Sequence, residues 1–213
     1  SRPLSFTINR FLAPRLIEAW DKIRYESQVA DRCLNTIGRR DRLGSRDRRR
    51  LAEAIFKALR RRGSVDALLG SKANDPQHSQ LWLATALEHD WPDGPKAMSF
   101  GEDESPSQAG NIPPFVIQNL ERSSINLLQL GRALRQRAPV TLRAAPESRE
   151  QLAEQLLLNG VETSLTTYAP NGLICHDGAQ LHLLDPPLRN LFEIQDEGSQ
   201  LLAMLVGACA EER

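Results

Sequence analysis

Cys175 and His176 are the only thiol and imidazole that are neighbours in the sequence. A cysteine nucleophile needs a base within hydrogen-bonding reach. The residues around this pair predict a short strand, and consecutive side chains on a strand point to opposite faces. We therefore expect structural roles for Cys175 and His176 and no catalytic dyad.

A second candidate for chemistry is the run Gln195-Asp196-Glu197. Two adjacent carboxylates could hold a metal ion, but no other hard ligands lie nearby in the sequence. The four histidines show no ligand spacing, and the three cysteines form no CxxC pair, so neither a zinc site nor a disulfide framework is indicated. Acidic residues favour the first turn of a helix, so residues 195–197 are expected to start one. The sequence predicts no catalytic, metal-binding or cofactor-binding residue in this chain.

An arginine cluster is the strongest candidate for a functional surface. Residues 1–62 contain 17 Lys+Arg and 7 Asp+Glu, a net charge of +10, whereas residues 63–124 carry −6 and residues 125–213 carry −4. Arginine is favoured for bidentate phosphate contacts and for stacking on bases, so the basic first third predicts an anionic partner, RNA. For any single arginine the competing interpretation is a solvated helical surface. The predicted RNA-binding residues are Arg39, Arg40, Arg42, Arg46, Arg48, Arg49, Arg50, Arg60, Arg61, Arg62, Arg132, Arg135 and Arg143.

The elements that would position this cluster are helices. Apolar residues recur with the helical period over residues 14–37, 45–62, 64–69, 76–89 and 113–137, and Gly63 is expected to end the helix that begins near Ser45. Trp82 and Trp91 are expected to pack in the core or between domains. Residues 99–112 are acidic and rich in helix breakers, which predicts an exposed loop. Residues 1–137 are therefore predicted to form a helical domain.

The period changes after Pro139. We expect a strand at 140–143, a helix at 149–159, a strand at 161–167, and a hairpin of 173–175 with 180–184 across Asp177-Gly178. This order predicts a small α/β module of the RRM or ferredoxin-like kind over residues 138–196. A last helix is expected from residue 197 to residue 210. The predicted fold class is mainly α with this module at its end.

The segment from Leu191 onward resembles a family landmark. Sun-type (Fmu/RsmB-like) bacterial rRNA cytosine-5 methyltransferases carry a stretch similar to G-x-F-x-V-Q-D-E-A-S-Q-L directly before their cofactor-binding domain. Gly198 stands where the family usually has alanine. The segment 138–144 also resembles the family's P-hydrophobic-x-L-R-V-N strand, although Ala144 and Ala145 replace its ending. The matching residues of the landmark are Phe192, Gln195, Asp196, Glu197, Ser199 and Gln200.

Residues 47–69 resemble the NusB-like helical domain that many of these enzymes carry, with a departure at Lys57-Ala58. The resemblance implies a NusB-like RNA-binding domain over 1–137 and a last helix (197–213) that leads into a methyltransferase domain absent from this chain. It also implies rRNA processing with S-adenosylmethionine as cofactor of the full-length protein and small-subunit rRNA as the partner. By itself the chain is expected to bind RNA and to catalyse nothing.

Two alternatives remain open from the sequence. NusB-like helices also bind proteins, so the acidic region 63–124 could be the docking face of a protein-interaction module. The chain could also be a stand-alone antitermination-like RNA-binding factor. No apolar run approaches the roughly 20 residues of a spanning helix, and the cysteine usage fits a reducing cytoplasm, so we expect a cytoplasmic protein with no membrane contact.

Overall fold

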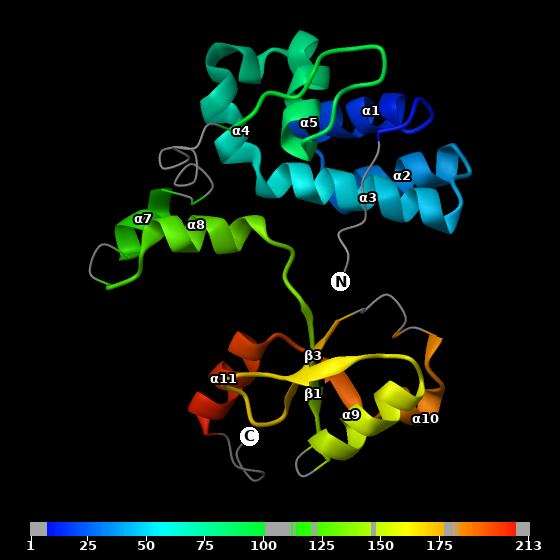
Figure 1. Ribbon diagram of the computed structural model, residues 1–213, viewed down its shortest axis with the longest axis vertical. Helices are drawn as coiled ribbons and strands as arrows, with labels where there is room; N and C mark the ends of the chain where they lie inside the picture. The colour runs from blue at the N-terminus through cyan, green and yellow to red at the C-terminus, as the bar shows by residue number, and fades with distance from the viewer. Residues whose placement is uncertain are drawn as a thin grey trace. The chain divides into compact units, whose positions relative to one another are not determined.

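The computed structural model describes residues 8–100, 112, 114–120, 123–145, 148–176, 181 and 183–207. The chain divides into two compact units with a boundary between Arg137 and Ala138. We call residues 8–137 the helical unit and residues 138–207 the sheet unit. The described part of the protein is mostly helical and contains a small four-stranded antiparallel sheet, as the mainly helical fold class predicted (Figure 1).

The helical unit is built from helices and two short 3-10 turns. The predicted stretch 14–37 is interrupted at residues 25–29, where Ser27 has a positive φ of 55°, so it forms two helices. Gly63 was wrongly expected to end a helix: it lies inside the next one, which begins directly after Arg61. The elements are α1 (Ala13–Arg24), α2 (Ala30–Arg40), α3 (Ser45–Arg60), α4 (Arg62–Leu69), η1 (Gly70–Asn74), η2 (Pro76–His78), α5 (Ser79–Leu87), α7 (Pro114–Leu120) and α8 (Leu127–Arg135).

Two stacked tryptophans lie at the centre of the helical unit. The rings of Trp20 (α1) and Trp82 (α5) are 3.9 Å apart between centroids, with an interplanar angle of 23°. The indole N–H of Trp82 donates to Asp66 Oδ1 at 2.7 Å, and Arg24, whose side chain is only 2% exposed, forms an ion pair with the same oxygen at 2.9 Å. These contacts join α1, α4 and α5. Trp91 is also buried, so both tryptophans pack in the core, the first of the two expected arrangements.

The sheet unit has the strand order β2-β3-β1-β4, and all its strand pairs are antiparallel. Helix α9 packs on the face of the sheet that carries Leu142 and Leu173, and Leu152 and Leu156 of α9 fill this core. The elements are β1 (Val140–Ala144), α9 (Arg149–Leu158), β2 (Thr163–Leu165), β3 (Gly172–Cys175), α10 (Pro186–Arg189), β4 (Phe192–Ile194) and α11 (Glu197–Val206).

The predicted hairpin of 173–175 with 180–184 is wrong. In the structure β3 lies between β2 and β1, so both of its edges are already hydrogen-bonded. Its hairpin partner is β2, and the turn that joins them precedes Gly172. Residues 177–180 and 182 lie outside the described residues. The strand that completes the sheet is β4, which the sequence pattern did not indicate.

Two further expectations fall largely or partly outside the described residues. Of the predicted loop 99–112, only residues 99, 100 and 112 are described. The last helix is described as Glu197–Val206 and not beyond Gly207. In the part of the chain that the structure describes, no helix is both long and apolar enough to cross a bilayer.

Replacement of Gly172 by alanine is expected to destabilise the sheet unit. A Cβ on Gly172 would lie 2.2 Å from Thr166 Oγ1 and 2.6 Å from its Cγ2. Thr166 is buried, and its hydroxyl lies within hydrogen-bonding distance of the carbonyl oxygens of Ala169 (2.6 Å) and Gly172 (3.0 Å). The Thr166 side chain therefore cannot move away without breaking these hydrogen bonds. We expect Gly172→Ala to lower the free energy of unfolding by about 1–3 kcal/mol in chemical denaturation.

Gly198→Ala is the matched control in the same unit. The nearest atom to its added Cβ is Asp196 Oδ1 at 3.3 Å, on an exposed side chain. The control should change the free energy of unfolding by less than about 1 kcal/mol. Equal stabilities for Gly172→Ala and the unsubstituted chain would contradict the packing described for Thr166.

Candidate nucleic-acid interface

Part of the arginine cluster is neutralised inside the helical unit. The Arg40 guanidinium forms two bonds to the Glu18 carboxylate, with Nη1–Oε1 at 2.6 Å and Nη2–Oε2 at 2.7 Å, and its Nε donates to Asp41 at 2.7 Å. Asp41 also lies 2.7 Å from Arg15 Nε, and Glu18 accepts from Lys22 at 2.8 Å. This network joins the end of α2 to α1, so Arg40 is a structural residue.

The electrostatics of this network are strong. The hydrogen bond from Arg40 lowers the pKa of Glu18 to about 2, with further help from Lys22 and against the effect of burial. Arg40 likewise lowers the pKa of Asp41. A charge-assisted bidentate pair is stronger than a neutral hydrogen bond. A phosphate would therefore have to displace two carboxylates to bind Arg40.

Four more predicted residues, along α3 and at the start of α4, also have a partner. Arg48 donates to the Leu43 carbonyl oxygen at 2.8 Å, and Arg49 pairs with Glu53 at 3.0 Å. Arg61 pairs with Glu88 at 2.9 Å. Burial raises the pKa of Glu88, but the hydrogen bonds and charges of Arg61 and Lys57 together outweigh it, so the pKa is lowered.

Arg62 completes this group, whereas Arg60 has no hydrogen-bond or ion-pair partner among the described residues and its Nε is buried without a hydrogen bond. Arg62 lies 3.7 Å from Asp66. Arg60 is partly buried, which lowers its pKa, and the charges of Arg137 and Arg61 lower it further.

A different set of arginines, in α2, α3 and the turn between them, has no hydrogen-bond or ion-pair partner for its side chains among the described residues. We call this set the open arginine surface: it consists of four predicted residues in α2, in α3 and in the turn between them, together with Arg32. Arg50 is half-buried and the others are exposed. The members are Arg32, Arg39, Arg42, Arg46 and Arg50.

Helix geometry groups the members of the open arginine surface. Arg46 and Arg50 are four residues apart on α3, so they share a face at a separation of about 6 Å along the axis. Arg32 and Arg39 are seven residues apart on α2 and share a face at about 10 Å. Arg42 lies in the connecting turn with a positive φ of 50°. Arg32 was missed in the sequence because it precedes the cluster, although its seven-residue spacing from Arg39 was available as a signal.

The remaining predicted arginines lie elsewhere. Arg132 and Arg135 belong to α8, and each of them has an interaction partner. Arg143 belongs to β1 of the sheet unit and pairs with Glu193 of β4 at 2.6 Å. The structure therefore brings together only the residues of the α2–α3 region, and of these it leaves four predicted arginines open.

The other candidate groups lie in the sheet unit. Cys175 is buried and His176 is exposed, as expected for neighbours at the end of a strand. Asp196 caps α11: its carboxylate accepts from the backbone N–H and the hydroxyl of Ser199, and the hydroxyl contact lowers its pKa. The helix-start interpretation of residues 195–197 is thereby confirmed. The described residues contain no group of three or more His, Cys, Asp or Glu side chains that could hold a metal ion.

Two further residues of the same segment connect α11 to the sheet unit. Glu197 accepts the backbone N–H groups of Tyr168 and Ala169. Gln200 is buried and donates to the carbonyl oxygens of Leu142 (3.3 Å) and Gln195 (2.9 Å). These polar residues therefore fix the helix against β1 and the β2–β3 turn.

No protein-family model and no curated protein matches the chain.

The Glu18 network makes a pH-dependent contribution to stability. Because the pKa of Glu18 lies at about 2 in the folded chain against 4.5 ordinarily, its ion pairs contribute stability that is fully present above pH 4.5 and is lost as the pH falls towards 2. Glu18→Gln removes this contribution. The difference in the free energy of unfolding between the two proteins should be largest near about pH 6 and smaller near about pH 3.

Urea denaturation at a series of pH values measures this difference. A difference that stays constant over the acidic range would contradict the assignment of the low pKa to the pair of Glu18 with Arg40.

Proposed function

We propose that the chain is an RNA-recognition region that binds RNA phosphates through the open arginine surface. The observation that carries this proposal is that five arginines of α2, α3 and the turn between them have no hydrogen-bond or ion-pair partner for their side chains among the described residues, although the same region contains several engaged ones. An arginine without an ion pair contacts a phosphate without first losing a carboxylate. Its planar guanidinium donates two parallel hydrogen bonds to phosphate oxygens.

The helix positions of these arginines support a contact with several phosphates. Arg46 and Arg50 project from successive turns of α3, and Arg32 and Arg39 from α2. Folded RNA is recognised largely by its shape, its phosphates and its unstacked bases, and a helical arginine surface suits all three. Small-subunit ribosomal RNA is the proposed partner, and the cytoplasm is the proposed location.

The wider role that we propose is substrate recognition for an S-adenosylmethionine-dependent rRNA cytosine-5 methyltransferase. The resemblance of the segment around residues 192–200 supports this role, and the helical unit is proposed to be NusB-like with the sheet unit as its RRM- or ferredoxin-like companion. Leu202, Leu205 and Val206 of α11 are exposed apolar side chains that a methyltransferase domain would cover.

S-adenosylmethionine, the methyl donor, would be bound outside the residues that the structure describes. In the resembled family S-adenosylmethionine binds a glycine-rich turn that follows a strand. Here β1 is followed by α9 through residues 145–148, which contain no glycine, so this connection does not fit the donor. No step of methyl transfer is assigned to this chain.

A protein-interaction module is the second candidate, and one observation favours it. Phe115, Ile125 and Leu134, in and between α7 and α8, are large apolar side chains that are largely exposed. Exposed apolar clusters mark protein contacts more often than RNA contacts. If the chain is a protein-interaction module, it should bind RNA weakly, and substitutions in the open arginine surface should leave its RNA affinity unchanged.

RNA affinity across a salt series tests the proposed function. The triple variant Arg39→Gln, Arg42→Gln, Arg46→Gln removes three charges of the open arginine surface. We expect it to bind a small-subunit rRNA fragment at least about tenfold more weakly, because three phosphate contacts are lost. Each lost contact also reduces the slope of log affinity against log salt concentration by about 0.7. The slope should therefore fall by about 2 in total.

A matched triple variant removes three paired arginines: Arg49→Gln, Arg62→Gln, Arg143→Gln. It changes the net charge by the same amount but breaks ion pairs on exposed sites, so its affinity and salt slope should stay close to those of the unsubstituted chain. Equal losses in both triple variants would point to a general charge effect. No loss in either one would favour the protein-interaction module.

A further inference from the structure

The sheet of the sheet unit has an open edge at β2. This strand is the first in the order β2-β3-β1-β4 and is paired on one side only. The backbone oxygen of Glu162 accepts from His176 N at 3.0 Å, and Thr166 N donates to Gly172 O at 3.1 Å, so these positions face β3. Main-chain hydrogen bonding alternates along an antiparallel strand, so the N–H and C=O groups of Thr163 and Leu165 point to the open edge.

The three-residue length of β2 is the one feature of its sequence that protects this edge. Natural sheets shield an edge strand by short length, by charged residues such as lysine, by proline or by a bulge. The strand reads Thr163-Ser164-Leu165, and Leu165 is 51% exposed. Thr163 and Leu165 have no hydrogen-bond partner among the described residues beyond the β2–β3 pairing. The edge therefore offers free main-chain donors and acceptors.

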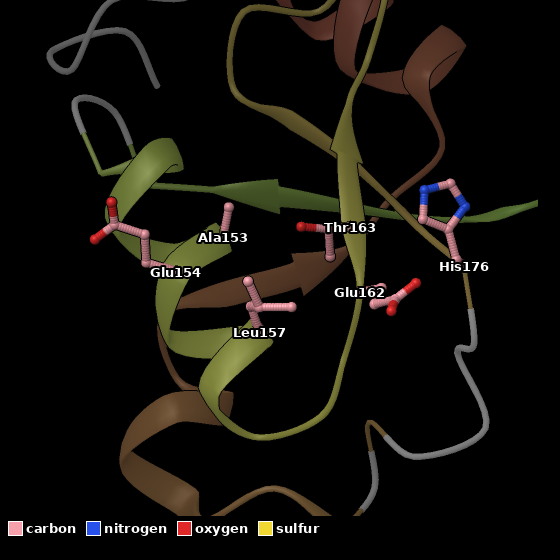
Figure 2. A pocket seen from close by; sticks show the side chains of 6 residues that line it. All are labelled: Ala153, Glu154, Leu157, Glu162, Thr163 and His176. Carbon is pink, nitrogen blue, oxygen red and sulfur yellow. The ribbon is translucent and has the colours of Figure 1, made fainter.

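A groove runs between this edge and helix α9. It has a volume of about 360 Å³ and is lined by Ala153, Glu154, Leu157, Glu162, Thr163 and His176. Figure 2 shows Ala153 and Leu157 projecting from α9 towards Thr163, whereas Glu162 and His176 lie on the opposite side of the strand. Leu157 is 60% exposed, so the wall of the groove that α9 forms is apolar and open.

Two carboxylates flank the groove. Glu154 is on α9 and Glu162 is directly before β2, and both are exposed. Neither carboxylate forms an ion pair among the described residues. The groove therefore combines an open strand edge, an apolar wall and unneutralised negative charge.

We propose that this groove binds an extended peptide segment of a protein partner, with alternating apolar and basic residues, which pairs with β2 as a fifth strand. An extended peptide that adds to a sheet edge gains affinity from main-chain hydrogen bonds and specificity from alternate side-chain positions. Side chains on one face of the added strand would contact Leu157 and Leu165 and are therefore apolar. Those on the other face would lie near Glu162 and are therefore basic. The groove is in the sheet unit, and the inference does not rest on the proposed RNA function.

A synthetic peptide tests this proposal with the 213-residue chain. The probe is fluorescein-labelled Gly-Lys-Val-Lys-Val-Lys-Gly, and its binding is followed by fluorescence anisotropy. Two comparison peptides replace lysine with glutamate or the central lysine with proline. We expect the lysine peptide to bind and both comparison peptides to bind at least about tenfold more weakly, because like charges repel and proline lacks the N–H that a paired strand donates.

Charge reversal in the protein locates the binding. Glu154→Lys with Glu162→Lys should weaken binding of the lysine peptide at least about tenfold. The matched control is Glu150→Lys with Asp185→Lys, which reverses two exposed carboxylates of the same unit outside the groove and should change binding less than about twofold.

Hydrogen exchange distinguishes strand addition from a loose charge contact. The bound lysine peptide should slow exchange of the Thr163 and Leu165 amides, since these N–H groups would become hydrogen-bonded. Three results would each overturn the proposal: no binding of the lysine peptide, equal losses in the two charge-reversal variants, or protection confined to other segments such as α11. None of these results bears on RNA affinity, so the two proposals are tested separately.

Discussion

The bidentate ion pair between Arg40 and Glu18 is the interaction on which the arginine surface depends. It joins the end of α2 to α1 and, with Asp41 and Arg15, fixes the start of the turn that leads to α3. The carboxylates of the helical unit are fewer than its basic groups, so pairing satisfies some arginines and leaves others open. The arginines of this basic segment therefore form two sets. One set stabilises the fold through its partners, and the other faces solvent.

The core could be predicted from the sequence because local periodicity determines it. Leu51 and Ile55 are four residues apart and both are buried, and Trp82, expected to pack in the core or between domains, is buried too. The pairing of the arginines could not be predicted in the same way. Arg40 and Glu18 are 22 residues apart, and Arg24 is buried against Asp66 across 42 residues, so only the tertiary arrangement of the helices brings these groups together.

The strand pairing of the sheet unit was predicted less well from the sequence than the helical core. Both Asn171-Gly172 and Asp177-Gly178 indicate turns, and the pattern gave no reason to prefer the first as the hairpin turn between two strands. β4 has only three residues, one of which is charged, so it carries no clear alternation. The start of α11 at Asp196 was better predicted, because capping is a local property of the chain.

The most direct test of the central claim is to map where RNA contacts the chain. Ultraviolet crosslinking of a small-subunit rRNA fragment, followed by mass spectrometry of the crosslinked peptides, gives this position at near-residue resolution. If the open arginine surface binds RNA, crosslinks should lie in α2, in the α2–α3 turn and in the first half of α3. Crosslinks concentrated in the acidic region 63–124, with none around Arg39 to Arg50, would contradict this proposal.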